Sequence, residues 1–244
     1  MEPGFYGIEA VAGAAPLGGV TGAKHVMIHG VAKANTTNDE SITVNEFIAA
    51  RIALCMGLPI APGTLVRTDT GALIYVMMRF GTKGETLPPV DPAAVIANNP
   101  HACAGIAMFD DLIANDDRHP GNLAFNPQVG VGIFDHSHAL LGPGPRSSGM
   151  TRLQSIGDQP RFNGCLLPHL TEYSHLRYWA DRIEKINPDL LGHISTTLTQ
   201  HGLTTAAEAE AIRSWLSARI GNVQSRLQAA QAYFPGVTEW GLPL

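Results

Sequence analysis

The first part of the chain alternates short apolar stretches with one longer helical pattern. Residues 25–34 are rich in Val, Met and Ile, as strands are. Over residues 42–56 the apolar residues recur three or four positions apart, and Gly57 follows where a helix C-cap belongs. The apolar stretches 64–67 and 72–79 flank a turn at Asp-Thr-Gly and predict a hairpin. We therefore expect a small unit of strands around one helix.

Beyond residue 92 the pattern is mostly helical. Apolar periodicity predicts helices over four segments, namely 101–114, 173–186, 189–201 and 205–234. Before them, the proline-rich segment 82–92 marks a connector. The pattern predicts an α+β fold with a small strand-rich part over residues 1–82 and a mostly helical part over residues 83–244. From the pattern alone, two independent domains are the alternative.

Composition places the chain among globular proteins. It has 244 residues, of which 45% are hydrophobic and 15% charged, enough for a sizeable core. The formal net charge of -5 gives no basic surplus, so nucleic acid is not expected as the main partner. If the protein handles nucleotide phosphates, it must therefore concentrate cations at the site itself.

The cysteines and the apolar stretches limit the class further. Cys55, Cys103 and Cys165 lie far apart without CxxC spacing, which argues against a disulfide framework or a zinc site. The first residues show no basic start followed by an apolar stretch, so no signal peptide is expected. The apolar runs are far shorter than the ~20 residues of a spanning helix. We expect a cytoplasmic protein with no membrane span.

A cluster of polar residues follows the helix predicted over 101–114. Residues 115–122 read Asn-Asp-Asp-Arg-His-Pro-Gly-Asn, and the apolar stretch that comes later, at 131–134, ends at Asp135. Loops held between rigid elements commonly display reactive groups. This cluster is therefore the strongest candidate for chemistry in the chain.

The spacing within the cluster points to phosphoryl transfer. That reaction needs a carboxylate to orient the attacking hydroxyl and oxygen ligands for Mg²⁺. Asp117 and Asn122 have the Asp-x-x-x-x-Asn spacing of the base and the metal-binding Asn in the protein-kinase catalytic loop. Asp135 stands at the end of a strand, where a second metal ligand belongs. The sequence thus predicts Asp117 as the catalytic base and Asn122 and Asp135 as ligands of Mg²⁺.

The neighbouring polar residues have several possible roles. Asp116 competes with Asp117 for the role of base, and the spacing to Asn122 favours Asp117. We expect His119 to contact a phosphate or Asp135; the alternative is an imidazole bonded to the loop backbone. Arg118 is expected to pair with a neighbouring carboxylate and hold the loop.

Two further pairs of polar residues lie near the cluster. Asp110 and Asp111 are expected to be exposed or capping groups. His136 and His138 alternate on a strand-like segment and lack an obvious third ligand, so zinc is not expected.

The loop also resembles known kinases. Asn-Asp-Asp-Arg-His-Pro-Gly-Asn followed by Ile-Phe-Asp-His resembles the catalytic loop and metal-binding Asp of phosphatidylinositol 3- and 4-kinases. It is more similar still to bacterial HipA-like kinases. The resemblance implies a two-lobed protein-kinase-like fold, with a small strand-rich N-lobe and a mostly helical C-lobe, that uses ATP and Mg²⁺.

The resemblance extends toward the N-terminus. Val-Ala-Lys at residues 31–33 is similar to the strand that carries the lysine contacting the α and β phosphates, which implies that role for Lys33. Residues 45–59 are similar to the helix that follows, with Glu46 as the partner of the lysine. Lys24 is the competing candidate for the lysine.

Two further nucleotide contacts are expected. The glycine-rich segment 13–22 lacks the Gly-x-Gly-x-x-Gly pattern, but its position suggests that backbone N–H groups around Gly18 and Gly19 cradle phosphates. Adenine is expected near the connector, beside Met77 and Met78.

Together these features predict an ATP- and Mg²⁺-dependent kinase that transfers a phosphoryl group to a hydroxyl. The acceptor can be a protein Ser or Thr, a small molecule or a lipid headgroup; no basic amphipathic stretch points to a membrane surface, so the first two are favoured. Thr21 and Ser41 are candidates for self-phosphorylation. The alternatives are a nucleotidyltransferase on the same fold, a nucleotide-binding pseudokinase, and a regulatory or antitoxin-associated protein that recognises a partner through the C-terminal helices.

Overall fold

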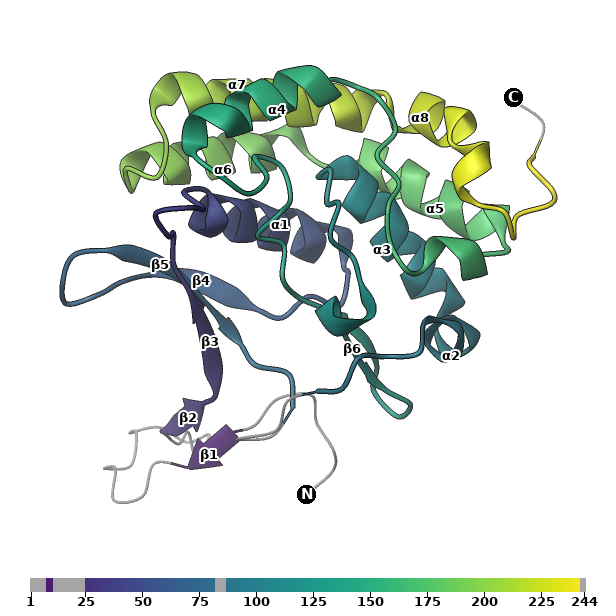
Figure 1. The fold of residues 1–244 in the computed structure, drawn as a ribbon, viewed down its shortest axis with the longest axis horizontal. Coiled ribbons are helices and arrows are strands. Elements are labelled where there is room, and N and C mark those ends of the chain that lie inside the picture. The colour runs from purple at the N-terminus through teal and green to yellow at the C-terminus, as the bar shows by residue number, and fades with distance from the viewer. Residues whose placement is uncertain (1–7, 11–24, 82–86, 242–244) are drawn as a thin grey trace, which may run out of the picture.

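The structure is a computed structural model that describes residues 8–10, 25–81 and 87–241. Figure 1 shows two lobes, with the strands of the N-terminal part on one side and most of the helices on the other. The α+β, two-lobed architecture predicted from the sequence is confirmed. The boundary predicted between residues 82 and 83 falls at residues outside the described ranges and stays a prediction.

The small lobe is built on a three-stranded antiparallel sheet in the order β3-β5-β4. Its strands are β3 (Gly30–Lys33), β4 (Gly63–Arg67) and β5 (Leu73–Met78), and a separate ribbon pairs β1 (Ile8–Ala10) with β2 (Val26–Ile28). In the register of the sheet, Val31 lies opposite Met77, and Lys33 lies opposite Tyr75. Facing residues of paired strands share one side of a sheet. The side chain of Lys33 is thereby placed beside the apolar pair of Val31 and Met77.

Helix α1 (Ile42–Met56) is packed between this sheet and the helical lobe. It ends at Gly57, whose left-handed conformation (φ 76°) lets its N–H bond the carbonyls of the last turn, as the sequence predicted. Because both sides of the helix are covered, polar residues such as Asn45 and Glu46 are buried along with the apolar ones. A buried carboxylate needs partners, and Glu46 finds them in the site described below.

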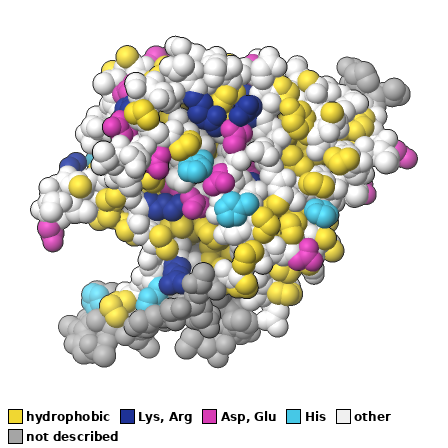
Figure 2. All heavy atoms as spheres, in the orientation of Figure 1, with side chains coloured by type: hydrophobic (Ala, Val, Ile, Leu, Met, Phe, Trp, Pro, Cys, Tyr) yellow, Lys and Arg dark blue, Asp and Glu magenta, His cyan; other side chains and the backbone are white. Residues whose placement is uncertain are grey.

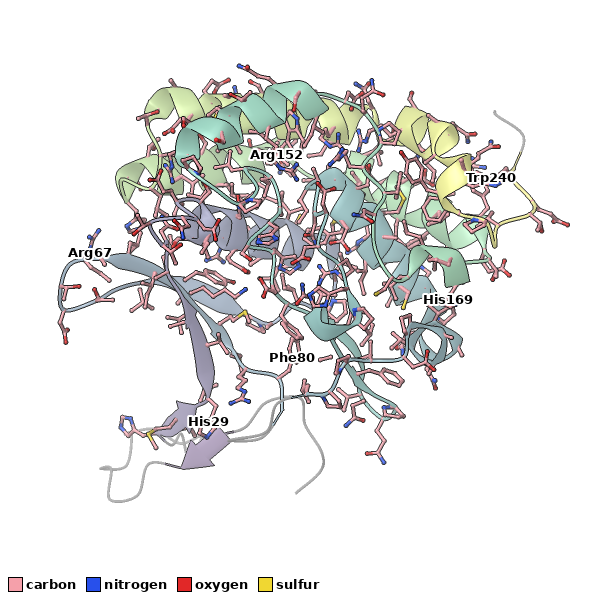
Figure 3. All side chains as sticks on the ribbon, viewed as in Figure 1. His29, Arg67, Phe80, Arg152, His169 and Trp240 are labelled. Carbon is pink, nitrogen blue, oxygen red and sulfur yellow. The ribbon has the colours of Figure 1, made fainter. Side chains whose placement is uncertain are left out.

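The large lobe surrounds α3 and carries the second hairpin. Its helices are α2 (Pro92–Asn98), α3 (Pro100–Leu112), α4 (Arg146–Ile156), α5 (Tyr173–Glu184), α6 (Pro188–Gln200), α7 (Ala206–Gly221) and α8 (Val223–Ala229), with short 3₁₀ turns at Pro120–Asn122, Leu167–His169 and Gln231–Tyr233. The hairpin pairs β6 (Leu123–Asn126) with β7 (Gly130–Ile133). Apolar residues of both lobes pack in one continuous core. Figure 3 labels Arg67 at the tip of the β4–β5 hairpin and Trp240 at the far end of the helical lobe.

Several predicted elements differ from the observed ones. The strand expected over 25–34 is interrupted at His29, which separates β2 from β3. The single helix expected over 205–234 ends at Gly221, and Asn222 separates α7 from α8. Glycine weakens a helix interior, which accounts for a break that apolar periodicity does not register. Helices α2 and α4 were not predicted, and the proline at residue 92 begins α2 instead of ending a connector.

Among the described residues, no helix combines the length and apolar character that crossing a membrane requires.

Candidate active site

Three segments that are distant in the sequence meet at Lys33. Its Nζ lies 2.5 Å from Oε1 of Glu46 on α1 and 2.6 Å from Oδ1 of Asp135, just after β7. On the face of the molecule shown in Figure 2, Lys or Arg, acidic and His side chains gather at the boundary between the lobes. The lysine–glutamate pair expected from the sequence is therefore present, and the same lysine also binds the predicted metal ligand. We call Lys33, Glu46 and Asp135 the cleft cluster.

Glu46 is held as a carboxylate although it is buried. Burial by itself would raise the pKa of Glu46, but its contacts with His136 and Lys33 outweigh this and hold the pKa below its usual value. The backbone N–H of His136 donates to Oε1 of Glu46 at 2.9 Å. Glu46 thus ties α1 both to the strand lysine and to the segment that carries Asp135.

Asp135 adopts a conformation that is unusual for a residue other than glycine. Its φ is 60°, in the left-handed region. Backbone strain of this kind is often stored at functional sites. Burial acts to raise the pKa of Asp135, yet Lys33 and Ser137 outweigh it and lower the pKa to about 2. Asp135 is therefore an anion across the physiological range.

The predicted base and the predicted metal-binding amide also lie together. Nδ2 of Asn122 donates to the backbone carbonyl of Asp117 at 2.8 Å and lies 3.5 Å from Oδ2 of its carboxylate. Nδ1 of His138 is 3.4 Å from that same Oδ2. The carboxylate of Asp117 is 40% exposed, so a substrate can reach it.

The buried side chain of Arg118 holds this loop in place. As predicted, it pairs with a carboxylate, namely Asp110, through Nε at 2.9 Å and Nη2 at 3.0 Å. Its Nη1 also donates to the carbonyls of Asn122 and Phe134, at 2.8 and 3.0 Å. One buried guanidinium therefore sets the distance between the catalytic loop and the segment leading to Asp135. The sequence-based assignment of Asp110 as an exposed or capping group was wrong, because it is the buried counter-ion of Arg118.

The protonation of His136 follows from its partner. Nη2 of Arg118 lies 2.8 Å from Nε2 of His136, and an arginine can only donate. Nε2 is therefore the acceptor, and the proton of the neutral ring is on Nδ1, 3.7 Å from Glu46. Complete burial, together with Arg118, lowers the pKa of His136. His136 is a neutral spacer between two ion pairs.

The two adjacent aspartates have different surroundings. Oδ2 of Asp116 accepts from Arg152 at 3.0 Å and from Arg161 at 2.6 Å. Arg152, labelled in Figure 3, reaches from α4 to this loop. Asp117 has no arginine partner among the described residues. The geometry thus supports the choice of Asp117 over Asp116 that the spacing favoured.

Not every predicted site residue is brought together. Nδ1 of His119 accepts from the N–H of Gly121 at 3.0 Å, which matches the structural alternative of an imidazole bonded to the loop backbone. Ser41 is 1% exposed and its hydroxyl is buried, so phosphorylation there would require the start of α1 to open. Gly18, Gly19, Thr21 and Lys24 lie outside the described residues, and their predicted roles stay predictions.

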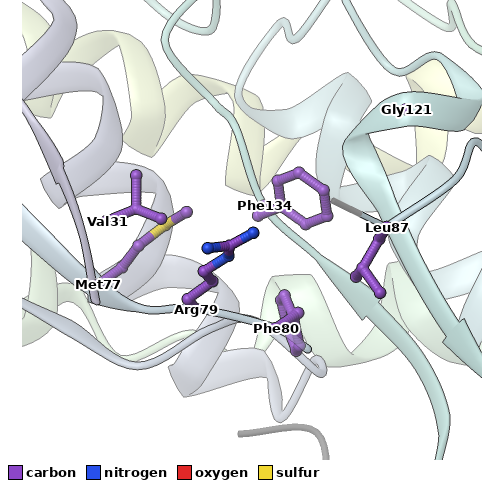
Figure 4. Close-up of a pocket in the computed structure, with 7 residues that line it drawn as sticks. All are labelled: Val31, Met77, Arg79, Phe80, Leu87, Gly121 and Phe134. Atoms are coloured by element: carbon purple, nitrogen blue, oxygen red, sulfur yellow. The ribbon is translucent and has the colours of Figure 1, made fainter. Parts of the chain in front are cut away.

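An apolar cavity adjoins the cleft cluster. It has a volume of about 180 Å³ and is lined by Val31, Met77, Arg79, Phe80, Leu87, Gly121 and Phe134. Figure 4 shows Val31 and Met77 on one side of it and Phe134 and Leu87 on the other. Phe134 immediately precedes Asp135, and Val31 is on the same strand face as Lys33. Of the two residues predicted to contact adenine, Met77 lines this cavity, whereas Met78, next along the strand, points to the opposite face of the sheet and is not among the lining residues.

The donor set fits a magnesium ion that is shared with phosphates. The Nδ2 of Asn122 is engaged by Asp117, and no described residue donates to its Oδ1, so this oxygen can face a metal. Asp135 supplies the carboxylate. Within the described ranges, no group of three or more His, Cys, Asp or Glu side chains is arranged to hold a metal ion. A single amide and a single carboxylate are a weak site alone, and Mg²⁺ usually completes such a site with waters and phosphate oxygens.

Sequence reasoning missed residues that hold these groups in place. Asn45 donates to the carbonyl of Ser137 at 2.7 Å and accepts from the N–H of Leu141 at 3.2 Å, clamping the segment after Asp135 onto α1. Ser137 donates to Asp135 at 2.8 Å. His138 was considered only as a metal ligand, although it contacts Asp117. The adjacency of Asn45 to Glu46 was the one signal available; the other contacts depend on how the chain turns after β7.

Comparison with known proteins gives a result at the level of the fold. No protein-family model matches the sequence, and no curated protein matches it. Among solved structures, the chain is similar to CtkA, a proinflammatory kinase of Helicobacter pylori. The TM-score is 0.55 at 15% identity, over 92% of this chain and 98% of CtkA. It also matches HipA of the Shewanella oneidensis MR-1 toxin–antitoxin system, solved with HipB and operator DNA, with a TM-score of 0.42 at 13% identity over 92% of this chain and 67% of HipA.

The likeness to CtkA bears on the resemblance that residues 115–122 carry. It supports the kinase-like part of that resemblance at the level of the fold, and it gives no support to the phosphatidylinositol-kinase part. The chain has a kinase-like fold.

Proposed function

We propose that this protein is an ATP- and Mg²⁺-dependent kinase that transfers a phosphoryl group to a hydroxyl acceptor. The observation that carries the proposal is Lys33, which is bound at once to Glu46 on α1 and to Asp135 beside the catalytic loop. A lysine held by a helix glutamate next to a metal-binding aspartate is what phosphoryl transfer requires of the kinase fold. The likeness to CtkA supports the same reading.

The nucleotide would lie between the lobes. The cavity beside Met77 and Phe134 offers apolar surfaces for adenine. Lys33 lies two residues beyond Val31 on the same face of β3. There it can donate to the α and β phosphates while Glu46 keeps it oriented. With Lys33 bound to phosphates, the carboxylate of Asp135 would be released from the ion pair that it makes with Lys33 in this structure and could hold Mg²⁺.

Asn122 and Asp135 would hold the metal ion against the phosphate oxygens. Bound there, Mg²⁺ supplies positive charge that offsets the charge of the transferred group. Since the protein provides only one carboxylate and one amide, we expect Mg²⁺ to bind appreciably only together with nucleotide.

Asp117 would accept a hydrogen bond, or the proton, from the acceptor hydroxyl. Its carboxylate is accessible, and Asn122 and His138 contact it on two sides and so restrict its orientation. Arg118 and Asp110 keep the loop rigid from the interior. We propose a protein Ser or Thr, or a small molecule, as the acceptor.

The test uses ATP labelled either on the γ or on the α phosphate, with Mg²⁺ and a panel of protein and small-molecule acceptors. Transfer of the γ label is the expected result. Transfer of the α label would instead make the protein a nucleotidyltransferase, and binding of ATP with transfer of neither label would make it a pseudokinase.

Two substitutions assign the roles. Asp117→Asn should lower turnover by about 10³-fold with ATP binding retained, because the contact to the acceptor hydroxyl is lost while the proposed nucleotide contacts remain. Asp135→Asn should weaken nucleotide binding in Mg²⁺ but not in EDTA. Wild-type phosphotransfer in both variants would remove the basis of the assignment.

A further inference from the structure

A second cavity shares no lining residue with the cleft cluster. It has a volume of about 380 Å³, within the ~300–1,000 Å³ range of small-molecule pockets. Its wall is formed by Phe47, Arg51, Thr64, Leu65, Leu190, His193, Ile194, Thr197 and His201. It thus opens between α1, the edge strand β4 and helix α6, and α1 packs against each of the other two. Figure 1 shows α1 lying between α6 and the strands β4 and β5.

The lining combines an apolar part with a basic part. On α6 the contributing residues recur at helical spacing, so His193, Thr197 and His201 form one stripe along the cavity. Phe47, Leu65 and Ile194 supply apolar surface. No carboxylate is among the lining residues, whereas one guanidinium and two imidazoles are. Such a lining suits a ligand with one apolar ring or chain and one anionic group.

Arg51 is the key cation of this cavity. Its guanidinium carbon lies 5.1 Å from the centre of the Phe47 ring. No carboxylate among the described residues pairs with it, in contrast to the arginines of the catalytic loop region. An arginine that is half-buried and has no counter-ion is a ready partner for a carboxylate or phosphate.

The cavity is linked to the cleft cluster by two short routes. Phe47 directly follows Glu46 on α1. Across the sheet, Leu65 on β4 faces Tyr75 on β5, and Tyr75 in turn faces Lys33 on β3. A ligand that fills the cavity therefore contacts the helix that carries Glu46 and the strand row that ends at Lys33.

We propose that this cavity is a binding site for a small organic anion, whose presence stabilises α1 in the position that holds the Lys33–Glu46 pair. By linkage, such a ligand raises the affinity for nucleotide, and nucleotide raises the affinity for the ligand by the same factor. The site is separate from the one proposed for phosphoryl transfer and does not depend on catalysis.

The experiment uses phenyl phosphate as the probe, with inorganic phosphate and phenol as its two separate halves. Binding to the full chain is followed by NMR through the imidazole signals of His193 and His201. We expect phenyl phosphate to bind more tightly than either half. Arg51→Gln should weaken it by about tenfold, because a charge-assisted contact is lost. Arg67→Gln, an exposed arginine at the far end of β4, is the matched control and should bind as wild type does.

A second variant keeps the test decisive if Arg51→Gln does not fold. Thr197→Phe fills the cavity from α6 without removing a charge and should abolish binding while the melting temperature is retained. The proposal is overturned if phenyl phosphate shifts neither imidazole, or if both variants bind it as well as wild type.

The coupling between this cavity and nucleotide binding is tested by a separate measurement. The dissociation constant of a non-hydrolysable ATP analogue is measured with and without phenyl phosphate, in the Asp117→Asn background, so that turnover plays no part. In the presence of phenyl phosphate, we expect the dissociation constant of the ATP analogue to fall by roughly threefold, as for a modest coupling energy. In Arg51→Gln, phenyl phosphate should leave this dissociation constant unchanged. If phenyl phosphate leaves the dissociation constant of the ATP analogue unchanged when Arg51 is present, the coupling is refuted. Competition between phenyl phosphate and the ATP analogue would instead place the probe in the nucleotide site.

Discussion

The structure contains two clusters of charged residues that differ in burial. The cleft cluster joins Lys33, Glu46 and Asp135, and the side chain of Asp135 in it is 36% exposed. The other, which we call the buried cluster, joins Asp111 on α3 to Arg219 on α7 and Arg226 on α8, with Asp111 and Arg219 at 0% exposure.

The difference separates charges that fix the fold from charges that can change partners. In the buried cluster, Asp111 accepts from Arg219 at 3.1 Å, from Arg226 at 2.9 Å and from the N–H of Arg161 at 2.7 Å. The carboxylate that accepts these bonds is completely buried. In the cleft cluster the side chains of Lys33 and Asp135 are 16% and 36% exposed, and under the proposed function Lys33 would move from Asp135 to a phosphate. The first arrangement therefore stabilises the fold, and the second is the one we propose for binding.

The largest effect that this comparison predicts is on stability. Asp111→Asn should reduce the free energy of unfolding by about 3–5 kcal/mol, because it leaves two buried arginines without their shared counter-ion. Urea unfolding followed by circular dichroism measures it. Asp158→Asn is the matched control, since Asp158 also pairs with Arg226, at 2.8 Å, but is 38% exposed.

For that control we expect a smaller loss, of about 1 kcal/mol, because the Asp158 carboxylate is partly solvated and Arg226 keeps Asp111 as a partner. Equal losses in the two variants would show that burial does not distinguish the clusters.

The buried cluster also shows which contacts could not be predicted from the sequence. The spacing of Asp117 and Asn122 could be recognised because one loop places both, and Asp135 because it ends the short apolar stretch that follows. Lys33 and Glu46 were implied by the resemblance to known kinases. Asp111 was predicted to be exposed or capping, and this was wrong. Its partners on α7 and α8 are more than a hundred residues away, and no local pattern records which arginines a folded helix will meet.

The helices also divide into those with a local sequence signal and those that distant contacts position. Helix α1 was predicted with its correct ends, because its apolar spacing and its Gly57 cap are both local signals. Helix α4 was missed because its residues are mostly polar and only Gly149, Leu153 and Ile156 are buried. It is positioned by contacts such as that of Arg152 with Asp116, which join distant segments.

The next effect concerns nucleotide affinity in the cleft cluster. Lys33→Met should raise the dissociation constant of Mg²⁺-ATP by about 10²-fold, because the phosphates lose a charge-assisted donor. Isothermal titration calorimetry measures it. Lys185→Met, at the exposed end of α5, is the control and should bind ATP normally.

Lys24→Met decides between the two candidate lysines. If Lys24→Met weakens ATP binding as strongly as Lys33→Met does, the assignment of Lys33 fails. A large loss of stability in Lys33→Met without any loss of ATP affinity would show that Lys33 serves to stabilise the fold, as the residues of the buried cluster do.

A smaller effect is expected at His138. His138→Gln should lower turnover by about tenfold with ATP affinity unchanged, because Asp117 loses a neighbour that restricts its carboxylate near the acceptor hydroxyl. Steady-state kinetics with γ-labelled ATP measure it. His169→Gln is the control, because His169 is exposed on a 3₁₀ turn and labelled in Figure 3 away from the cleft. An equal decrease in both variants would remove His138 from the site.

The smallest effect is the pH dependence carried by Asp135. Its pKa is lowered from 3.8 to about 2 in the folded protein, so its contribution to stability is present above its unfolded value and is lost as the pH falls toward 2. Because the side chain is partly exposed, solvent screening keeps this contribution below about 1 kcal/mol. NMR titration of the carboxyl carbon of Asp135 measures the shift directly. In Lys33→Met the midpoint should move upward, since burial raises the pKa of Asp135 and the lysine is the main group that opposes it. A midpoint that stays in place without Lys33 would mean that Ser137, and not the lysine, holds this aspartate ionised, and the cleft cluster would then lack the exchangeable contact on which the proposed nucleotide binding depends.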